Sequence, residues 1–143
     1  MQEVDAYTER LMGSASFLTD QEGGVVDFFQ KTKILQEYAD DYRVESICEI
    51  GFNAGHSAAF LLAANPTASF VSFDNFHHNY SAYAARSVHA LFPQRRIVFQ
   101  VGDSRQSVLR FHETFPDFKC NLMFVGDFNM CDCSVLTIQL LYF

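Results

Sequence analysis

The sequence predicts an α/β fold built on a doubly wound, mainly parallel sheet of about four strands. Short apolar runs of strand length alternate with stretches of helical spacing through residues 45–125, and the connections between them are short. Parallel strands joined in this way need right-handed crossovers, so we expect helices on both faces of the sheet. A doubly wound sheet that begins at its centre has the strand order 3-2-1-4.

The individual elements follow from apolar spacing and from the residues that interrupt it. Strands are predicted at residues 45–51, 68–74, 96–101 and 119–125. Helices are predicted at residues 4–12, 25–42, 56–64, 80–91 and 103–115. Two of the helices stop where a proline follows, because the residue before a proline disfavours the helical conformation. Residues 134–143 are open between helix and strand.

Length and composition indicate one folded domain, residues 1–143. Within it we expect an N-terminal helical segment at 1–44, a core at 45–125 that carries the site, and an atypical tail at 126–143. The chain is 49% hydrophobic, and its net charge of −7 argues against nucleic acid or an anionic membrane as its main partner. It has neither an apolar run long enough for a membrane helix nor a secretory leader, so a cytoplasmic location is expected.

The cysteines and histidines predict no metal site. Cys48 and Cys120 lie in apolar, strand-like runs and are expected to be buried thiols. Cys131 and Cys133 form a C-x-C pair without the second pair that a zinc site needs. His77-His78 is expected to belong to a solvated loop. Together with the lack of a leader, these thiols favour a reducing compartment.

A glycine loop follows the first predicted strand. Gly51, Asn53 and Gly55 occupy alternating positions directly before the helix at 56–64. Glycine, and asparagine to a lesser degree, allow a backbone to turn sharply and to approach a ligand closely. The helix then directs its free N–H groups at the same place, which is where nucleotide-like ligands bind in α/β sheets. The alternative is an ordinary strand–helix turn.

Acidic residues end the next two predicted strands. Asp74 comes at the end of the strand at 68–74, about 20 residues after the glycine loop, where a carboxylate can accept hydrogen bonds from ribose hydroxyls. Asp103 follows the strand at 96–101, where it either accepts a hydrogen bond from an adenine amino group or caps its helix. Asp74 has a similar alternative as a turn residue.

The ligand is expected to lack phosphate groups. The loop matches neither the dinucleotide pattern G-x-G-x-x-G nor the P-loop pattern G-x-x-x-x-G-K-[ST]. Glu49 precedes the loop, and its negative charge would repel a pyrophosphate but would attract a cationic ligand group, directly or through water.

At these residues the chain resembles the class I S-adenosylmethionine-dependent methyltransferases, which have a Rossmann-like fold. The resemblance covers about residues 25–125 and is closest to the small-molecule group whose first motif reads E-I-G-x-N-x-G-x-S, here Glu49–Ser57. It implies S-adenosylmethionine as cofactor and a small-molecule acceptor. It also implies a cofactor site formed by Glu49, Gly51, Phe52, Asn53, Gly55 and Ser57 around the methionine part, Asp74 and Asn75 at the ribose, and Gly102, Asp103 and Ser104 near the adenine.

The fourth predicted strand departs from that family. Members of this type continue this strand into F-[IV]-D-G-x-H, whereas this chain has Gly126-Asp127 in the opposite order and no histidine. Asp127 is the candidate catalytic base, and no divalent metal is expected. The family fold has seven strands, so we expect strands five to seven to be lacking. The chain is then a fragment, an isoform or an inactive paralogue.

That early end should leave the fourth strand as an exposed apolar edge. Residues 134–143 would cover it as a strand or a helix, or a second copy of the chain would pair with it. Two functions therefore remain open from the sequence. One is methyl transfer to an oxygen or nitrogen of a small molecule, and the other is a catalytically inactive cofactor-binding or protein-interaction module. A nicotinamide-dependent oxidoreductase is disfavoured by the absent G-x-G-x-x-G.

Overall fold

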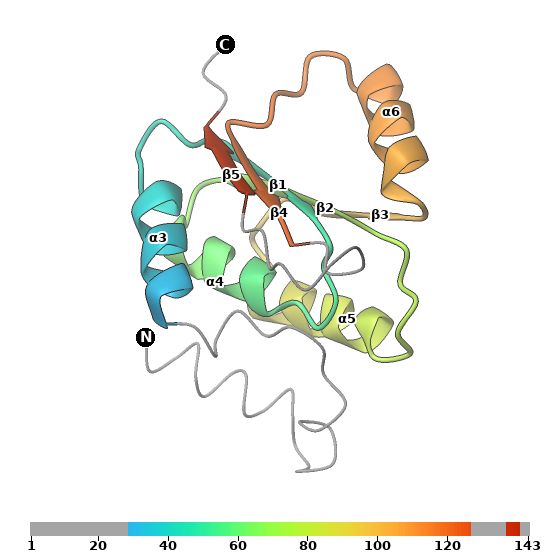
Figure 1. The fold of residues 1–143 in the computed structure, drawn as a ribbon, viewed down its shortest axis with the longest axis horizontal. Coiled ribbons are helices and arrows are strands. Elements are labelled where there is room, and N and C mark those ends of the chain that lie inside the picture. The colour runs from blue at the N-terminus through green and yellow to red at the C-terminus, as the bar shows by residue number, and fades with distance from the viewer. Residues whose placement is uncertain (1–28, 127–136, 141–143) are drawn as a thin grey trace.

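The computed structural model describes residues 29–126 and 137–140 of the chain. They form a five-stranded sheet with the strand order β3-β2-β1-β4-β5 (Figure 1). The strands are β1 (Ser46–Ile50), β2 (Ser69–Asp74), β3 (Ile97–Val101), β4 (Leu122–Val125) and β5 (Thr137–Leu140). The first four are parallel and β5 is antiparallel to β4. The predicted α/β class and the order 3-2-1-4 are therefore confirmed.

The helices lie on both faces of the sheet, as predicted. They are α3 (Phe29–Ala39), α4 (His56–Ala64), α5 (Ser81–Leu91) and α6 (Ser104–Thr114). Figure 1 shows α3, α4 and α5 on one side of the sheet and α6 on the other. The described part of the predicted helix at 25–42 is α3, which ends at Ala39, and the predicted helix at 4–12 lies outside the described residues.

Alternation along the strands separates two apolar layers. In β1, Ile47 packs into the main core with α3, α4 and α5, while the next residue, Cys48, packs into a smaller cluster with Phe111 of α6. In β2, Phe70 likewise packs into the main core and the next residue, Val71, into the smaller cluster. Successive side chains of a strand point to opposite faces, so a sheet covered on both sides needs nearly continuous apolar strands.

One buried asparagine ties together three segments of the main core. Asn65, at the end of α4, donates hydrogen bonds from its side-chain amide to the carbonyls of Ala39 and Val44, both at 2.8 Å. Its Oδ1 accepts from the backbone N–H groups of Thr67 at 3.1 Å and Ala68 at 3.0 Å. The side chain therefore connects the end of α3, the start of β1 and the turn into β2.

The outer edge of β4 is paired with residues of the same chain. β5 runs antiparallel to it with Leu122 opposite Leu140 and Val125 opposite Thr137. Of the two alternatives for residues 134–143, the strand is therefore observed at 137–140. The β4 edge that the sequence was expected to expose is therefore covered within the chain, by one of the alternatives that the sequence left open.

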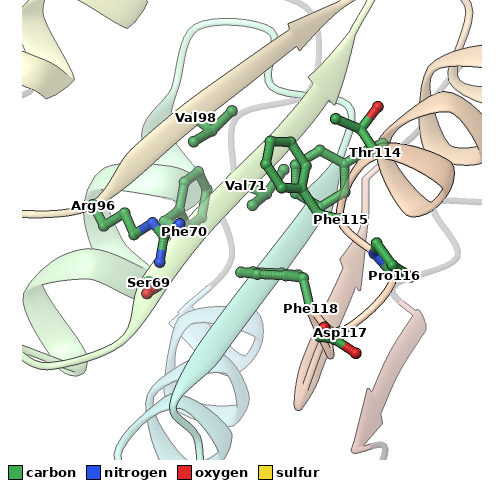
Figure 2. Close-up of a pocket in the computed structure, with 11 residues that line it drawn as sticks. Ser69, Phe70, Val71, Arg96, Val98, Thr114, Phe115, Pro116, Asp117 and Phe118 are labelled. Carbon is green, nitrogen blue, oxygen red and sulfur yellow. The ribbon is translucent and has the colours of Figure 1, made fainter.

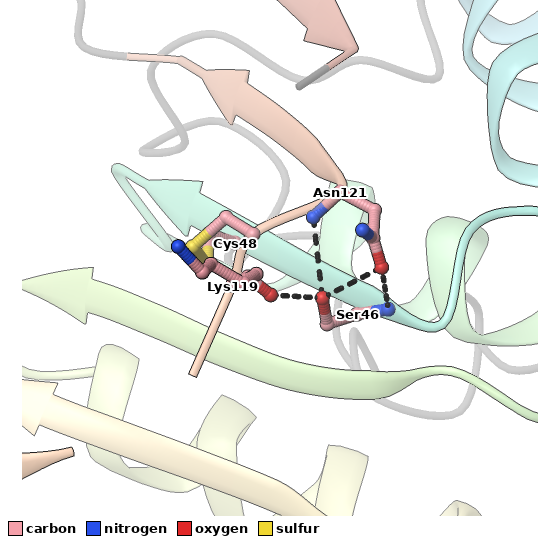
Figure 3. The surroundings of a disulfide bond; sticks show 5 residues. Ser46, Cys48, Lys119 and Asn121 are labelled. Carbon is pink, nitrogen blue, oxygen red and sulfur yellow. Dashed lines mark hydrogen bonds between the residues drawn. A yellow bond between two sulfur atoms is a disulfide. The ribbon is translucent and has the colours of Figure 1, made fainter. Parts of the chain in front are cut away.

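Cys48 and Cys120 form a disulfide, with their Cα atoms 5.6 Å apart (Figure 3). The bond links the middle of β1 to the segment that enters β4. Beside it, the Ser46 hydroxyl donates to the carbonyl of Lys119 and accepts from the Asn121 N–H at 3.2 Å. The prediction of two free buried thiols is wrong. Disulfides are rare in reducing compartments, so this pair of cysteines gives no support to the predicted reducing environment.

Candidate functional site

The predicted glycine loop connects β1 to α4 at the carboxyl end of the sheet. Three of its residues have a left-handed backbone, with φ of 91° at Gly51, 50° at Asn53 and 78° at Gly55. A Cβ atom on Gly55 would also lie 2.6 Å from Cζ of Phe52, which is closer than atoms can approach. The loop therefore requires glycine at residue 55 for its backbone and for the ring beneath it.

Phe52 supports the loop from below. Its side chain is 1% exposed and packs against the rings of Phe99, 4.9 Å away, and Phe76, 5.9 Å away, measured between centroids. The sequence places Phe52 among the residues around the ligand, but its ring lies in the core. Its backbone is the part that lies at the site, where its N–H donates to the carboxylate of Asp74 at the end of β2.

Asp74 lies beside the glycine loop, as its position at the end of β2 predicts. Its Oδ2 accepts hydrogen bonds from the N–H groups of Phe52 at 2.7 Å and Asn53 at 3.0 Å, and its Oδ1 accepts from Phe76 N–H at 2.6 Å. An ionised carboxylate has about four acceptor positions. Asp74 thus fixes the loop and its own turn, and these three hydrogen bonds use three of the acceptor positions of its half-buried carboxylate.

Glu49 lies under the loop rather than at its surface. Its side chain is fully buried, and its two carboxylate oxygens accept hydrogen bonds from the hydroxyls of Ser57 and Ser72, the latter at 2.9 Å. Burial raises the pKa of Glu49 from 4.5 to about 7, against the two serine hydrogen bonds, which lower it. Glu49 therefore holds the start of α4 against β2, and its carboxylate is engaged by these serines instead of facing a cationic ligand group.

The end of β3 is joined to the end of β2 through backbone atoms, and its acidic side chain is bound locally. Gly102, with φ of 136°, donates its N–H to the carbonyl of Asp74 at 2.9 Å, which fixes the two strand ends side by side. Asp103 caps α6 by accepting from the N–H of Arg105 at 3.0 Å and is also bonded by the guanidinium of that residue. The hydrogen bonds from Arg105 lower the pKa of Asp103 to about 2. The cap, one of the two predicted roles for Asp103, is the observed one.

Two further predicted residues have local positions. Ser104 is the first residue of α6. Asn75 is exposed, and its side chain accepts a hydrogen bond from the N–H of His77 at 2.9 Å, which forms a local turn after β2. Gly51, Asn53, Gly55, Ser57 and Asp74 are thus the predicted residues that the structure gathers most closely around the end of β1.

Tyr80 is a residue of this site that the sequence analysis missed. It immediately precedes α5, is 8% exposed, and its hydroxyl donates to Oδ1 of Asn53 at 2.6 Å. No spacing rule predicts this contact, because the two residues are 27 positions apart and belong to different loops. Only the return of the β2–α5 segment over the glycine loop brings them together.

Comparison with known proteins identifies the fold. No family model matches the sequence, and no curated protein matches it. Among solved structures, the O-methyltransferase from Bacillus cereus, in complex with SAH, matches with a TM-score of 0.63 and 19% identity over 87% of this chain and 54% of its own. The chain has the fold of the class I methyltransferases.

Two further structures share this methyltransferase fold. A TDP-rhamnose 3′-O-methyltransferase of calicheamicin biosynthesis has a TM-score of 0.55 and 19% identity, over 87% of this chain and 64% of its own. The O-methyltransferase TomG from Streptomyces achromogenes, in complex with SAM, has a TM-score of 0.54 and 23% identity, over 67% of this chain and 43% of its own. The chain therefore spans about half the length of the methyltransferases it matches.

A hollow of about 400 Å³ lies elsewhere in this methyltransferase fold (Figure 2). It is formed by the start of β2, by Arg96 before β3 and by the segment that follows α6, where Phe115 and Phe118 contribute aromatic rings. It contains none of the predicted site residues. The hollow is at the opposite end of the strands from the glycine loop, because it is lined by Ser69, the first residue of β2, and not by Asp74, the last.

No three histidine, cysteine, aspartate or glutamate side chains in residues 29–126 and 137–140 are grouped as ligands of a metal ion would be. None of the helices described there is long and apolar enough to span a bilayer.

Proposed function

We propose that this chain binds S-adenosylmethionine at the carboxyl end of β1 and transfers the methyl group to an oxygen or nitrogen of a small molecule. The observation that carries the proposal is the glycine loop with three left-handed residues, placed at the start of α4 and hydrogen-bonded to Asp74 of the neighbouring strand. The similar solved structures are O-methyltransferases, which supports the same reaction class.

The residues present fit the two ends of such a ligand. The N-cap of α4 is Gly55, which has no side chain to cap the helix, so the N–H groups and the positive dipole end there suit the carboxylate of the methionine part. The remaining acceptor position of Asp74 suits a ribose hydroxyl. Ser57 is held by Glu49, which keeps the first turn of α4 in register with β1 and β2.

When bound, the cofactor supplies an electrophilic methyl group on sulfur. The chain's own contribution is mainly orientation, since holding donor and acceptor in line accounts for a large share of such a rate. Asp127 is the proposed base for an acceptor that must lose a proton, and it lies outside the described residues. Gly102, Asp103 and Ser104 remain the proposed adenine end, with the backbone N–H of Ser104 in place of the Asp103 carboxylate, which Arg105 holds.

Calorimetric titration with S-adenosylmethionine and S-adenosylhomocysteine tests the cofactor directly. We expect Asp74→Ala to weaken binding by about 1–3 kcal/mol, because the change removes a ligand acceptor and leaves loop N–H groups unsatisfied. The matched control is Asp117→Ala, which removes the same charge from an exposed position at the hollow and should leave binding unchanged. Thermal melts of both variants confirm that they are folded.

The outcomes separate the claims. Absence of heat with either compound on the wild-type chain would refute the cofactor proposal, and equal affinity in Asp74→Ala would remove Asp74 from the site. Turnover is then assayed with radiolabelled methyl groups across hydroxyl- and amine-bearing small molecules. Binding without turnover favours the alternative, a catalytically inactive binding or protein-interaction module.

A further inference from the structure

The segment between β2 and α5 folds back over the glycine loop. Besides the carboxylate of Asp74, two of its side chains reach the loop. The ring of Phe76 stacks on Phe52 with the centroids 5.9 Å apart and the planes at 26°. The hydroxyl of Tyr80 donates to Oδ1 of Asn53 at 2.6 Å. Both contacts are made to the two loop residues whose N–H groups bind Asp74.

Asn53 is the loop residue whose conformation most needs support. Its φ of 50° is left-handed, which is unfavourable for a residue with a Cβ, although asparagine tolerates it better than most. The two flanking left-handed positions, Gly51 and Gly55, are glycines and need no such help. A hydrogen bond that fixes the Asn53 side chain therefore stabilises the one non-glycine turn of the loop.

Tyr80 is itself held firmly in place. Its ring is buried and stacks against the ring of His78, with the centroids 4.9 Å apart and the planes at 4°. Its carbonyl accepts the first hydrogen bond of α5, from the N–H of Ala84 at 2.9 Å. The Tyr80 side chain is therefore fixed at the start of α5, so it loses little conformational entropy when its hydroxyl binds Asn53.

We propose that Tyr80 is a positioning residue of the cofactor site. By holding Asn53, it keeps the glycine loop in the left-handed form that leaves room for the ligand above α4, without touching the ligand itself. This inference rests on the proposed function for the identity of the ligand. The loop geometry that it explains is independent of that identity.

The variant Tyr80→Phe tests the proposal, because it keeps the ring and the stack on His78 and removes only the hydroxyl. We expect the Kd for S-adenosylhomocysteine, measured by calorimetry, to rise roughly 3- to 10-fold, as expected for one lost neutral hydrogen bond. Tyr83→Phe is the matched control. Tyr83 lies in the first turn of α5, just after Tyr80, but is 68% exposed, so the same chemical change there should leave the Kd unaltered.

A double-mutant cycle shows whether Tyr80 acts through Asn53. Asn53→Gly keeps the left-handed conformation accessible and removes the acceptor. In that background Tyr80→Phe should cause no further loss of affinity. Additive losses would show that the hydroxyl acts through a group other than Asn53 and would overturn the proposal, as would an unchanged Kd in the single variant.

Hydrogen exchange of the ligand-free chain gives a readout that does not depend on the ligand. The amides of residues 53–56 should exchange faster in Tyr80→Phe than in the wild type, and at the wild-type rate in Tyr83→Phe. If the wild type binds neither cofactor compound, the proposed function fails while this measurement still decides whether Tyr80 orders the loop. Equal exchange rates in the wild type and Tyr80→Phe would overturn the inference on its own.

Discussion

Replacing Glu49 by glutamine isolates the energetic cost of the buried carboxylate beneath the glycine loop. The side chain is fully buried, and within the described residues its hydrogen bonds come from the hydroxyls of Ser57 and Ser72 and not from a cation that would offset the loss of water around its charge. Glutamine has nearly the same shape. Its carbonyl can accept from one serine and its NH₂ can donate to the other, so the variant keeps both contacts without a charge.

The expected magnitude follows from the pKa of Glu49, which burial raises from 4.5 to about 7. Between these values the folded chain keeps a proton on Glu49 that the unfolded chain has released. The free energy of unfolding therefore falls as the pH rises through this window, and the penalty is complete above the folded-state pKa. At 1.36 kcal/mol per pKa unit, it amounts to about 3 kcal/mol.

Urea unfolding followed by circular dichroism measures the effect. The difference in free energy of unfolding between Glu49→Gln and the wild type should be near zero at about pH 4, below the unfolded-state pKa, and should reach up to about 3 kcal/mol in favour of the variant at about pH 8. Other titrating groups cancel because they are common to both proteins. Glu45→Gln is the matched control, since it makes the same substitution at an exposed position just before β1.

A difference that stays constant from about pH 5 to about pH 8 would refute this reasoning, because it would mean that Glu49 titrates alike in the folded and unfolded chains. A wild type that is more stable than the variant at about pH 8 would refute it as well. That result would show that the carboxylate is stabilised by a positive group outside the described residues.

Three further substitutions probe the fold around the site. Gly55→Ala should lower the free energy of unfolding by about 2 kcal/mol or more in urea titrations, because it combines a left-handed backbone with a Cβ 2.6 Å from the Phe52 ring. Cys120→Ser should cost about 4 kcal/mol, since the disulfide to Cys48 closes a loop with a sequence separation of 72, and should abolish the effect of reductant on the melting temperature. Asn65→Ala should cost about 3 kcal/mol in the same titrations, because two buried carbonyls lose their donor.

Each of these has its own control. Gly102 also has a positive φ, of 136°, but no atom lies closer than 3.5 Å to a Cβ added there, so Gly102→Ala is the control for backbone strain without the clash. A loss of stability in Gly102→Ala equal to that in Gly55→Ala would rule out the clash with the Phe52 ring. The double variant Cys131→Ser, Cys133→Ser should keep the effect of reductant on the melting temperature. If that effect is lost in the double variant, the disulfide involves Cys131 or Cys133 instead of joining Cys48 to Cys120. Asn65→Asp keeps the acceptor and loses the two donated bonds, so wild-type stability in that variant would contradict the role given to the amide.

The sequence predicted the fold because its signals are local. Alternating strand and helix patterns, with short connections, restrict the chain to parallel strands and crossovers, and the observed order β3-β2-β1-β4 follows. The boundaries of α4 were predicted without error, since Gly55 starts the helix and Asn65-Pro66 ends it. The positions of the glycine loop and of Asp74 beside it were predictable for the same reason, because the carboxyl ends of adjacent parallel strands must meet.

What the side chains do at those positions was decided by the tertiary structure. The sequence predicted that Glu49 would attract a cationic ligand group. Sheet register instead places Glu49 opposite Ser72 and beneath α4, where its carboxylate accepts hydrogen bonds from serine hydroxyls. Asp103 is near its expected place but is bound by Arg105. Cys48 and Cys120 are joined because the segment before β4 returns alongside β1, a relation with no signature in the sequence.

The sequence by itself therefore determined the class of sheet, the place of the loop and the acid that adjoins it, because local backbone preferences and strand ends set these. Only the tertiary structure decided which carboxylate is fully buried and which is half-buried beside the loop, which cysteines pair, and that Tyr80 holds Asn53. Those contacts join residues that are distant in sequence. Their partners are chosen by strand register and by the path of the connecting segments, and a linear pattern does not record either.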